Sequence, residues 1–341
     1  MRGSDTREFE GHFGMGAGDR KRFGVIGVAG YIARRHLEAI KAVGGDLKVA
    51  YDVFDSVGQM DASFPDARFF TGFEEFAAHA HMLRSQGNGL DYVSICSPNF
   101  LHRPHIEFAL RAGSDAICEK PLVLEPADVD ALEQLERETG RNVSTILQLR
   151  LNKANIALRD ELAKGPGRHV VDLTYVTPRG PWYYASWKGD ESKSGGIVTN
   201  IGVHLFDLVG FLFGPLRESI VHHRAMDCAA GILEHERATV RWFLSINKRD
   251  LETSTGDLAA CRRLTIGERM HNLSGDFRDL HTKSYSEILA GRGFPLVEVK
   301  PAIAAVAEIR HAAIEPGRGT PHPHLDSVLR DKERYRDGLP I

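Results

Sequence analysis

The sequence lacks long apolar runs, a strong charge bias and clustered cysteines. No uninterrupted apolar run approaches the length of a membrane span. The formal net charge of −3 gives no general attraction for nucleic acid or for an anionic membrane surface. The four cysteines are scattered without the spacing of a metal site. We therefore expect no membrane, nucleic-acid or metal partner, and a reduced, cytoplasmic protein.

The chain also lacks internal repeats and low-complexity linkers. Its 341 residues, 42% of them hydrophobic and 26% charged, are enough for two ordinary globular domains. Residues 1–22 are rich in glycine, arginine and acids and have no apolar core. We therefore expect a disordered leader there rather than a secretory signal.

A glycine cluster follows the first apolar run, which ends at Ile26. Helical periodicity begins directly afterwards, so the order is strand, tight turn and helix. Such a turn presents backbone N–H groups to a pyrophosphate, with Gly27 for the turn and Gly30 for close approach. The spacing, Gly-x-x-Gly-x-x-Ala, differs from the usual dinucleotide fingerprint, so this pattern alone is equally consistent with an ordinary strand–helix turn.

A second apolar run, 47–51, ends in Asp52. A carboxylate at the end of the second strand can bind the hydroxyls of an adenine ribose, and it would repel a 2′-phosphate. We therefore expect NAD rather than NADP. Asp55 and Ser56 lie close by, so a simple turn at this position stays an alternative.

Strands alternate with helices up to about residue 150, which predicts an α/β fold with a parallel, doubly wound Rossmann sheet. Ligands bind such sheets at the carboxyl ends of the strands. Polar groups follow four of the expected strands, at Asp52, Ser97-Pro98-Asn99, Glu119-Lys120-Pro121 and Gln148.

Beyond residue 150 alternating strands dominate, and we expect an α+β domain with an open, mainly antiparallel sheet. The chain is thus divided into the leader, an NAD-binding domain at 23–150, a substrate and oligomerisation domain at 151–322, and a tail at 323–341. The histidine- and proline-rich tail has no assigned role.

Lys120 and His204 are the residues that could handle protons. The Lys120 ammonium could stabilise an alkoxide as hydride leaves, although a salt bridge with Glu119 is the simpler explanation. His204 follows Asn200 by four residues, and Asp207 falls on the same side of the expected helix. A neutral imidazole suits the removal of a hydroxyl proton, whereas a lone histidine is more often a core residue.

Aromatic residues and cations are mixed between residues 178 and 188. Arginine can pair with phosphate or carboxylate oxygens and rings can stack on a base, so the cluster suits an anionic nucleotide ligand. Packing at an interface would explain it equally well. His102 and His105 have no further ligand set nearby; we interpret His102 as lining the cofactor turn and reject a zinc site.

Four motifs in the same order resemble those of the Gfo/Idh/MocA oxidoreductases: the glycine turn, Ser97–Asn99 with His102, Glu119–Pro121 and 195–204. The resemblance covers about Phe23 to Pro321 and implies an NAD(P)-binding Rossmann domain followed by an open-sheet domain. Shorter stretches resemble members that oxidise the 3-hydroxyl of UDP-linked N-acetylated sugar uronates for bacterial surface polysaccharide (O-antigen). These stretches are Ala29–Ala33, Ser94–Asn99, Ile146–Arg150, Ser186–Asp190, Thr199–His204, Arg241–Ser245 and Leu289–Gly293.

The resemblance also implies roles for individual residues. Many members carry Asp where this chain has Asn200. Because an amide cannot take a proton, the resemblance implies that the base is His204 or Lys120 and that Asn200 orients a neighbouring group. The glycine spacing is one residue longer than usual, so Gly30 and Tyr31 are expected to cover the pyrophosphate. Expected cofactor contacts come from Gly27, Gly30, Tyr31, Ile32, Asp52, Asp55, Ser97, Pro98, Asn99, His102, Glu119, Lys120 and Gln148. Expected substrate contacts come from Arg150, Arg179, Trp187, Lys188, Asn200 and His204.

The resemblance further implies a homodimer or homotetramer, and in some relatives 2-oxoglutarate regenerates NAD. Two other functions remain open at this point. One is oxidation of a free sugar or inositol, against which the aromatic–cation cluster argues. The other is a non-catalytic dinucleotide-binding sensor, against which the presence of both Lys120 and His204 argues.

Overall fold

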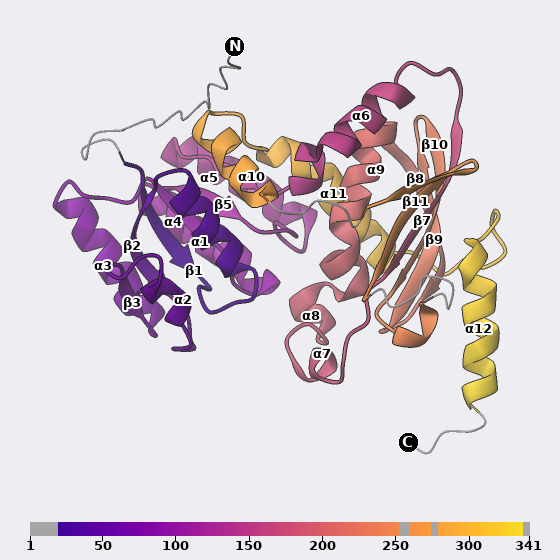
Figure 1. Cartoon of the computed structure of the whole chain (residues 1–341), viewed down its shortest axis with the longest axis horizontal. Helices are drawn as coiled ribbons and strands as arrows, with labels where there is room; N and C mark the ends of the chain where they lie inside the picture. Colours follow the sequence, from indigo (N-terminus) through magenta and orange to yellow (C-terminus); the bar gives the residue numbers. More distant parts are fainter. Residues whose placement is uncertain (1–19, 252–258, 274–278, 337–341) are drawn as a thin grey trace, which may run out of the picture.

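The computed structural model describes residues 20–251, 259–273 and 279–336, without side chains for 331–336. Most of the expected leader, 1–19, therefore lies outside the described residues, as do 337–341 of the tail. Arg22 already belongs to the first strand, so the fold begins one residue earlier than expected. Figure 1 shows two sheet-containing parts with a layer of helices between them.

The first sheet is parallel throughout, which confirms the doubly wound prediction. Its strands run in the order β3-β2-β1-β4-β5-β6. Helices α1 (Ala33–Ala42), α3 (Phe73–Ser85), α4 (His102–Arg111) and α5 (Pro126–Thr139) connect these strands, with the short α2 (Gly58–Asp61) before β3. The strands are β1 (Arg22–Ile26), β2 (Asp46–Tyr51), β3 (Arg68–Phe70), β4 (Tyr92–Ile95), β5 (Asp115–Cys118) and β6 (Val143–Thr145).

The second sheet is mixed and mostly antiparallel, as expected, in the order β12-β11-β7-β10-β9-β8. Only the β7–β10 pair within it is parallel among the described residues. The sequence analysis did not identify β9, β11 and β12, because β9 begins with small residues and β11 and β12 are rich in charge. The strands are β7 (His169–Val176), β8 (Leu216–Arg224), β9 (Cys228–His235), β10 (Ala238–Ser245), β11 (Cys261–Ile266) and β12 (Arg269–Asn272).

Helices α9 (Val203–Phe213) and α11 (Leu296–His311) cover the face of this sheet that looks toward the first sheet (Figure 1). Helix α11 continues through Pro301, which lies inside it. A π-helical turn, Val198–Gly202, leads into α9. The remaining short helices are η1 (Asn99–Leu101), η2 (Gln148–Leu151), α6 (Lys153–Leu162), α7 (Trp182–Ala185), α8 (Glu191–Ser194) and η4 (Lys248–Asp250).

The helical segment Glu191–Phe213 corrects the expectation that nothing in the chain reaches the length of a membrane span. It has 23 residues, a mean hydropathy of 1.6 over its most apolar window, and few charges. However, 72% of that window is buried inside the fold, which is what the central helix of a domain core also shows. Length and composition alone are therefore weak evidence for a membrane span here.

Helix α10 (Leu280–Leu289) packs with the first sheet although it follows the second in the chain. Tyr285 and Ile288 belong to the same apolar cluster as Phe23 and Leu37. Phe294 then pairs with Thr145, beside β6. The sequence-based division at residue 150 therefore separates segments that the fold brings together.

The described part of the C-terminal segment, from His322 to Arg336, lies across the outer face of the second sheet. His322 stacks on Phe243 with ring centroids 5.7 Å apart. Helix α12 (Pro323–Arg336) continues there, and Leu325 and Val328 pack with Phe243 and Ala230. Figure 1 shows α12 on the side of the sheet away from α9 and α11. The tail is thus a cover for this face.

Candidate active site

The glycine turn has the geometry that a dinucleotide needs. Gly27 has φ of 86°, and a Cβ there would lie 2.6 Å from backbone atoms of Cys96 and Ser97, so no side chain fits. A Cβ on Gly30 would lie 3.1 Å from the Gly27 carbonyl oxygen. Ile32 is the N-cap residue of α1 and has no side-chain cap, so the helix N-terminus is open to a phosphate. The Tyr31 side chain beside it is 93% exposed.

Asp52 lies at the end of β2, where the sequence predicted it. Its two oxygens accept hydrogen bonds from the backbone N–H groups of Ala29 and Phe54, each at 3.0 Å. The carboxylate therefore holds the glycine turn against the second strand, and each oxygen keeps a lone pair for a ribose hydroxyl. Asp55 is exposed on the turn that follows.

The polar groups after β4 serve mainly to join parts of the chain. The Ser97 hydroxyl lies 2.8 Å from His105 Nδ1. The Asn99 amide donates to the Ser194 carbonyl at 2.9 Å and to Asn200 Oδ1 at 3.4 Å, which links the first sheet to the second part. Pro98 between them is half-buried. These contacts fix the loop that faces the second part.

The His102 ring is held between the loops that follow β4 and β5, and its place beside the cofactor turn stays a prediction. The side chain is 1% exposed and lies between the carbonyl oxygens of Pro121, at 2.7 Å, and Ser97, at 2.8 Å. Burial lowers the pKa of His102, although both carbonyls favour the protonated ring. His102 therefore ties together the loops that follow β4 and β5.

Glu119 belongs to a buried hydrogen-bonded network, and its contact with the cofactor stays a prediction. Its Oε1 accepts hydrogen bonds from His36 Nε2 at 3.1 Å and His281 Nε2 at 2.9 Å. Its Oε2 accepts from the backbone N–H of Lys120 at 3.1 Å, so the expected salt bridge with the Lys120 ammonium is replaced by these bonds. His36 Nδ1 lies 2.7 Å from the Tyr285 hydroxyl, which lies 2.6 Å from Ser94 Oγ. We call these five residues (Ser94, Tyr285, His36, Glu119 and His281) the histidine–glutamate network.

The histidine–glutamate network is consistent with one pattern of protons. Burial raises the pKa of the Glu119 carboxyl, but the bonds from His281 and His36 bring that pKa well below its usual range. Burial lowers the pKa of His36, so its ring is neutral and Nδ1 accepts from Tyr285. Within the described residues, His36, Glu119 and His281 are also the one group with the proximity of a metal site. Their hydrogen bonds account for that proximity.

Lys120 and His204 converge at the start of α9. Lys120 Nζ donates to the Asn200 carbonyl oxygen at 3.4 Å, and the Asn200 amide donates to the Tyr183 hydroxyl at 3.0 Å. Both ring nitrogens of His204 are buried and have no hydrogen-bond partner among the described residues. Burial, then Lys120 and Arg262, lower the pKa of His204 far below its usual range, so the ring is neutral. A neutral imidazole with a free ring nitrogen can accept a proton, so the predicted role of His204 as a base stays a prediction.

Arg150 and Asp207, both expected near this site, bind each other instead. The Arg150 guanidinium donates to the two Asp207 oxygens at 2.9 and 2.6 Å, and it also pairs with the Glu298 carboxylate and carbonyl. Asp207 is 3% exposed. Arg150 therefore belongs to an ion-pair cluster with Asp207 and Glu298, and its contact with substrate stays a prediction.

Gln148 and the aromatic and cationic residues between 178 and 188 have side chains whose contacts leave room for a ligand. Gln148 Oε1 is a buried acceptor without a partner among the described residues. Lys188 Nζ lies 4.6 Å from the Trp187 ring centroid and 5.5 Å from that of Trp182. Burial, Arg179 and Lys120 lower the pKa of Lys188, which shows that these cations share one region.

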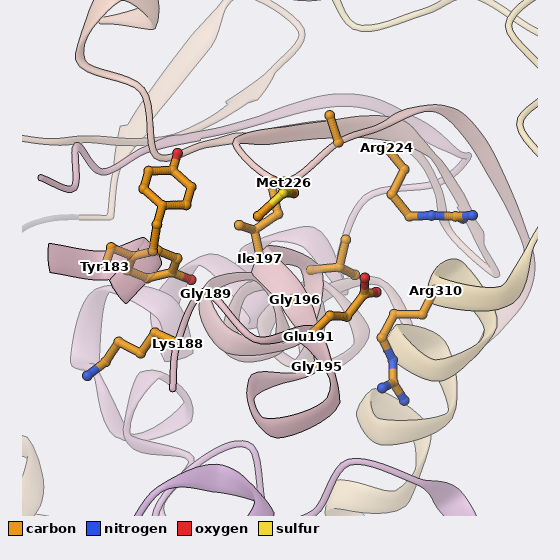
Figure 2. Close-up of a pocket in the computed structure, with 13 residues that line it drawn as sticks. Tyr183, Lys188, Gly189, Glu191, Gly195, Gly196, Ile197, Arg224, Met226 and Arg310 are labelled. Atoms are coloured by element: carbon orange, nitrogen blue, oxygen red, sulfur yellow. The ribbon is translucent and has the colours of Figure 1, made fainter. Parts of the chain in front are cut away.

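A cavity of about 260 Å³ adjoins this cluster (Figure 2). Tyr183 and Lys188 lie at one end of it, and Arg224 and Arg310 lie at the other. Tyr183, Arg224 and Arg310 are not among the site residues predicted from the sequence. Nothing local in the sequence distinguishes them, because β8, α7 and α11 meet only in the folded chain.

The parallel sheet, the glycine turn and the Lys120–His204 pair together define a dinucleotide-dependent oxidoreductase. The chain belongs to the Gfo/Idh/MocA family. Residues 21–146 match "Oxidoreductase family, NAD-binding Rossmann fold", and residues 169–254 match "Oxidoreductase family, C-terminal alpha/beta domain".

The chain is similar to the WlbA (WbpB) dehydrogenase of Thermus thermophilus, with 46% identity and a TM-score of 0.87. The match covers 89% of this chain and 100% of that chain. That protein was solved with NAD and alpha-ketoglutarate, and with NAD and UDP-GlcNAcA.

Curated relatives match over shorter regions. The 1,5-anhydro-D-fructose reductase of Ensifer adhaerens is 26% identical over 212 residues, 60% of this chain and 60% of its own length. A putative UDP-kanosamine synthase oxidoreductase subunit of Amycolatopsis mediterranei is 29% identical over 164 residues, 48% of this chain and 45% of its own length. The matches thus span about half of these relatives.

Proposed function

We propose that this protein oxidises the 3-hydroxyl of UDP-N-acetyl-2-amino-2-deoxy-D-glucuronate to the 3-keto sugar nucleotide, with NAD as the oxidant. The observation that carries the proposal is the neutral, buried His204 ring beside the Lys120 ammonium, since a hydroxyl between them would satisfy both. The substrate is inferred from the Thermus relative, solved with UDP-GlcNAcA.

The residues fit NAD. The Gly27 cradle and the uncapped start of α1 suit a pyrophosphate, and Asp52 suits the adenine ribose. The orphaned Gln148 Oε1 suits an amide donor such as the nicotinamide carboxamide. When bound, NAD accepts the hydride from the sugar carbon.

The residues of the chain handle the proton and the oxygen. The hydrogen on the sugar carbon leaves with its bonding electron pair as hydride, and the carbonyl forms. At the same time the hydroxyl proton passes to His204, which becomes an imidazolium. The Lys120 ammonium donates a hydrogen bond to the same oxygen and offsets its growing negative charge. The backbone carbonyl oxygen of Asn200 positions the Lys120 ammonium by accepting a hydrogen bond from it. Lys120 is the second candidate for the base.

We assign the diphosphate and uracil end to Arg179, Trp187 and Lys188. Two cations match the diphosphate charge, and the indole rings beside Lys188 offer a stacking surface. We further propose 2-oxoglutarate as the acceptor that regenerates NAD, since the Thermus relative was solved with alpha-ketoglutarate. A cytoplasmic homodimer or homotetramer in surface-polysaccharide (O-antigen) synthesis completes the proposal.

The test uses cofactor-stripped protein, NAD and three substrates: UDP-GlcNAcA, UDP-N-acetylglucosamine and myo-inositol. We expect NADH absorbance with the uronate, and a product that has lost two hydrogen atoms. Adding 2-oxoglutarate should then consume the NADH. Turnover of inositol alone would favour the rival sugar-alcohol activity, and no turnover with any substrate would favour a sensor.

A further inference from the structure

The cavity of Figure 2 lies at the start of the helix that carries Asn200 and His204. This helix continues from the π-helical turn at Val198 into α9, and its N-cap residue Ile197 has no side-chain cap. Ile197 and Val198 both line the cavity. The first N–H groups of a helix lack partners within it and carry a partial positive charge, so this wall of the cavity favours an anion.

A buried arginine in the wall of the same cavity has an unused donor. The side chain of Arg310 is 7% exposed, and its Nη2 donates to the Leu124 carbonyl oxygen at 2.5 Å and to Glu125 Oε1 at 2.8 Å. Its Nε is buried without a hydrogen-bond partner among the described residues. An unpaired buried donor is costly, so Arg310 gains from an acceptor that enters the cavity.

Cations predominate in the wall of the cavity. Arg224 Nη1 donates to the carbonyl oxygens of Ile309, at 2.7 Å, and Ala312, at 2.9 Å, and in the described part of the chain no carboxylate pairs with this guanidinium. Arg224, Arg310 and Lys188 are the cations among the described lining residues, and the one carboxylate among them is that of Glu191. The excess of positive charge again favours an anion.

The Glu191 carboxylate lies where such an anion is expected. A Cβ on Gly196, which directly precedes Ile197, would lie 3.5 Å from Glu191 Oε1. The Glu191 side chain projects toward the end of the cavity where Arg224 and Arg310 lie (Figure 2). It is exposed, and within the described residues no hydrogen bond or ion pair holds it there. A ligand with stronger negative charge can therefore displace it.

The cavity is two hydrogen bonds away from the Lys120 ammonium. Lys120 Nζ donates to the Asn200 carbonyl oxygen at 3.4 Å, and Asn200 Nδ2 donates at 3.0 Å to the hydroxyl of Tyr183, which lines the cavity. A UDP-linked uronate carries its carboxylate directly on the sugar ring, whereas its diphosphate extends away from the ring. With the ring held beside Lys120, the diphosphate is the anionic group that extends far enough to enter the cavity.

We propose that this cavity binds the diphosphate of the sugar nucleotide, with Arg224 and Arg310 as binding residues in addition to Lys188. This inference rests on the proposed function, because it assumes a sugar nucleotide whose ring lies beside Lys120. Helix starts bind phosphate oxygens through backbone N–H groups, and guanidinium groups bind them through a planar fork. Glu191 lowers the affinity, because its carboxylate has to leave the helix start before the phosphates enter.

The test measures dissociation constants by calorimetry for UDP-GlcNAcA, UDP-N-acetylglucosamine and UDP, with saturating NADH so that no oxidation occurs. Arg224→Gln removes a charge from the cavity, Arg224→Lys keeps it, and Glu191→Gln removes the competing carboxylate. Arg217→Gln is the matched control, since Arg217 is exposed at the other end of the same strand, β8, and does not line the cavity. Thermal unfolding shows that each variant is folded.

We expect Arg224→Gln to weaken the binding of all three ligands by about 10- to 100-fold, because each of them carries the diphosphate. Arg224→Lys should lose less, because it keeps the charge without the fork. Glu191→Gln should strengthen the binding of all three by about 2- to 5-fold at low salt, and by less at high salt. Arg217→Gln should leave the three constants unchanged.

Two results would overturn the proposal. One is a loss in Arg224→Gln that is confined to UDP-GlcNAcA, because it would place the sugar carboxylate in the cavity. The other is unchanged binding of the three ligands in Arg224→Gln or in Glu191→Gln. Because Glu191 is exposed, Glu191→Gln tests the proposal even where a variant of Arg224 does not fold.

The failure of this site and the failure of the proposed function are distinguishable. If the unaltered protein binds none of the three UDP compounds, the proposed function is wrong and the diphosphate site falls with it. If it binds them through Arg224 but does not oxidise UDP-GlcNAcA, only the proposed reaction is wrong. If it oxidises UDP-GlcNAcA while the Arg224 and Glu191 variants bind all three compounds unchanged, only the site is wrong.

Discussion

Lys120 lies between two buried regions that differ in how the ring nitrogens of their histidines are hydrogen-bonded. On its backbone side, His36 has Tyr285 on one ring nitrogen and Glu119 on the other. On its side-chain side, both ring nitrogens of His204 lack a partner among the described residues. An unpaired buried polar group costs about 1–3 kcal/mol, whereas a paired one costs little. The paired region holds the strand end in place, and the unpaired region is where a ligand gains most by binding.

The largest effect should come from the unpaired region. We expect His204→Ala to lower single-turnover hydride transfer by about 10²–10⁴-fold, because the proton acceptor is lost, with NAD binding intact. Lys120→Ala should lose at least as much and Asn200→Ala less. NADH absorbance in a rapid-mixing experiment measures each rate. Near-normal transfer in His204→Ala would remove His204 from the mechanism and leave Lys120 as the base.

Acid should destabilise the fold, because buried neutral histidines take up protons more readily once the chain unfolds. His105 lies outside both regions, against Ser97, and burial lowers the pKa of His105 to about 4, while the unfolded chain takes up that proton near pH 6.5. The unfolded state therefore binds more protons between these values, and stability falls as pH drops from about 6.5 to about 4, by about 3 kcal/mol for this group. Glu119 acts in the same direction, since its lowered pKa keeps it charged while the unfolded carboxyl protonates.

Urea unfolding at several pH values measures this dependence. His105→Gln should flatten the curve between about pH 6.5 and about pH 4, because the glutamine does not titrate. A curve as steep as that of the unaltered protein would show that His105 contributes nothing to it.

Breaking the histidine–glutamate network should lower both the free energy of unfolding and kcat, each by less than the effects described above. His281→Leu removes one of the two donors to Glu119 Oε1, and we expect the free energy of unfolding to fall by about 2 kcal/mol. Because Glu119 also holds the Lys120 backbone, we expect kcat to fall by about 10-fold or more with little change in the NAD dissociation constant. His281→Gln keeps an N–H donor and should recover most of both losses. Equal losses in the two variants would contradict the positioning role.

The smallest effect should come from Asp52, which is paired but still has spare lone pairs. Asp52→Ser should weaken the binding of NAD by about 10-fold, because the ribose contact is lost. It should also bring the dissociation constants of NAD and NADP closer together, because the repulsion of the 2′-phosphate is lost. Titration of both dinucleotides into stripped protein measures this. Equal or tighter binding of NADP by the unaltered protein would show that Asp52 does not select the cofactor.

The first domain was predictable because its information is local. The apolar runs that end at Ile26 and Tyr51 are strands in the fold, and Gly27 forms the turn that follows the first. The carboxyl ends of parallel strands lie at one edge of the sheet, so the position of Asp52, Asn99 and Lys120 along that edge could also be inferred.

The second domain was less predictable because its strands and helices pack against segments that are far away in the sequence. Its three unidentified strands have no clear alternation of apolar and polar residues. The position of α10 beside α1 joins segments that are far apart in the chain. Such packing depends on shapes and surfaces that exist only once the sheets have formed.

The sequence by itself determined the cofactor fold, the order of the domains and the residue types available for chemistry, since these follow from periodicity and spacing. Only the tertiary structure decided which partner each charged group has. Arg150 and Lys188 are both cations, but one meets the buried Asp207 and the other lies against the Trp187 ring. A buried charge must have a partner, and the folded neighbours of a residue decide which partner it has.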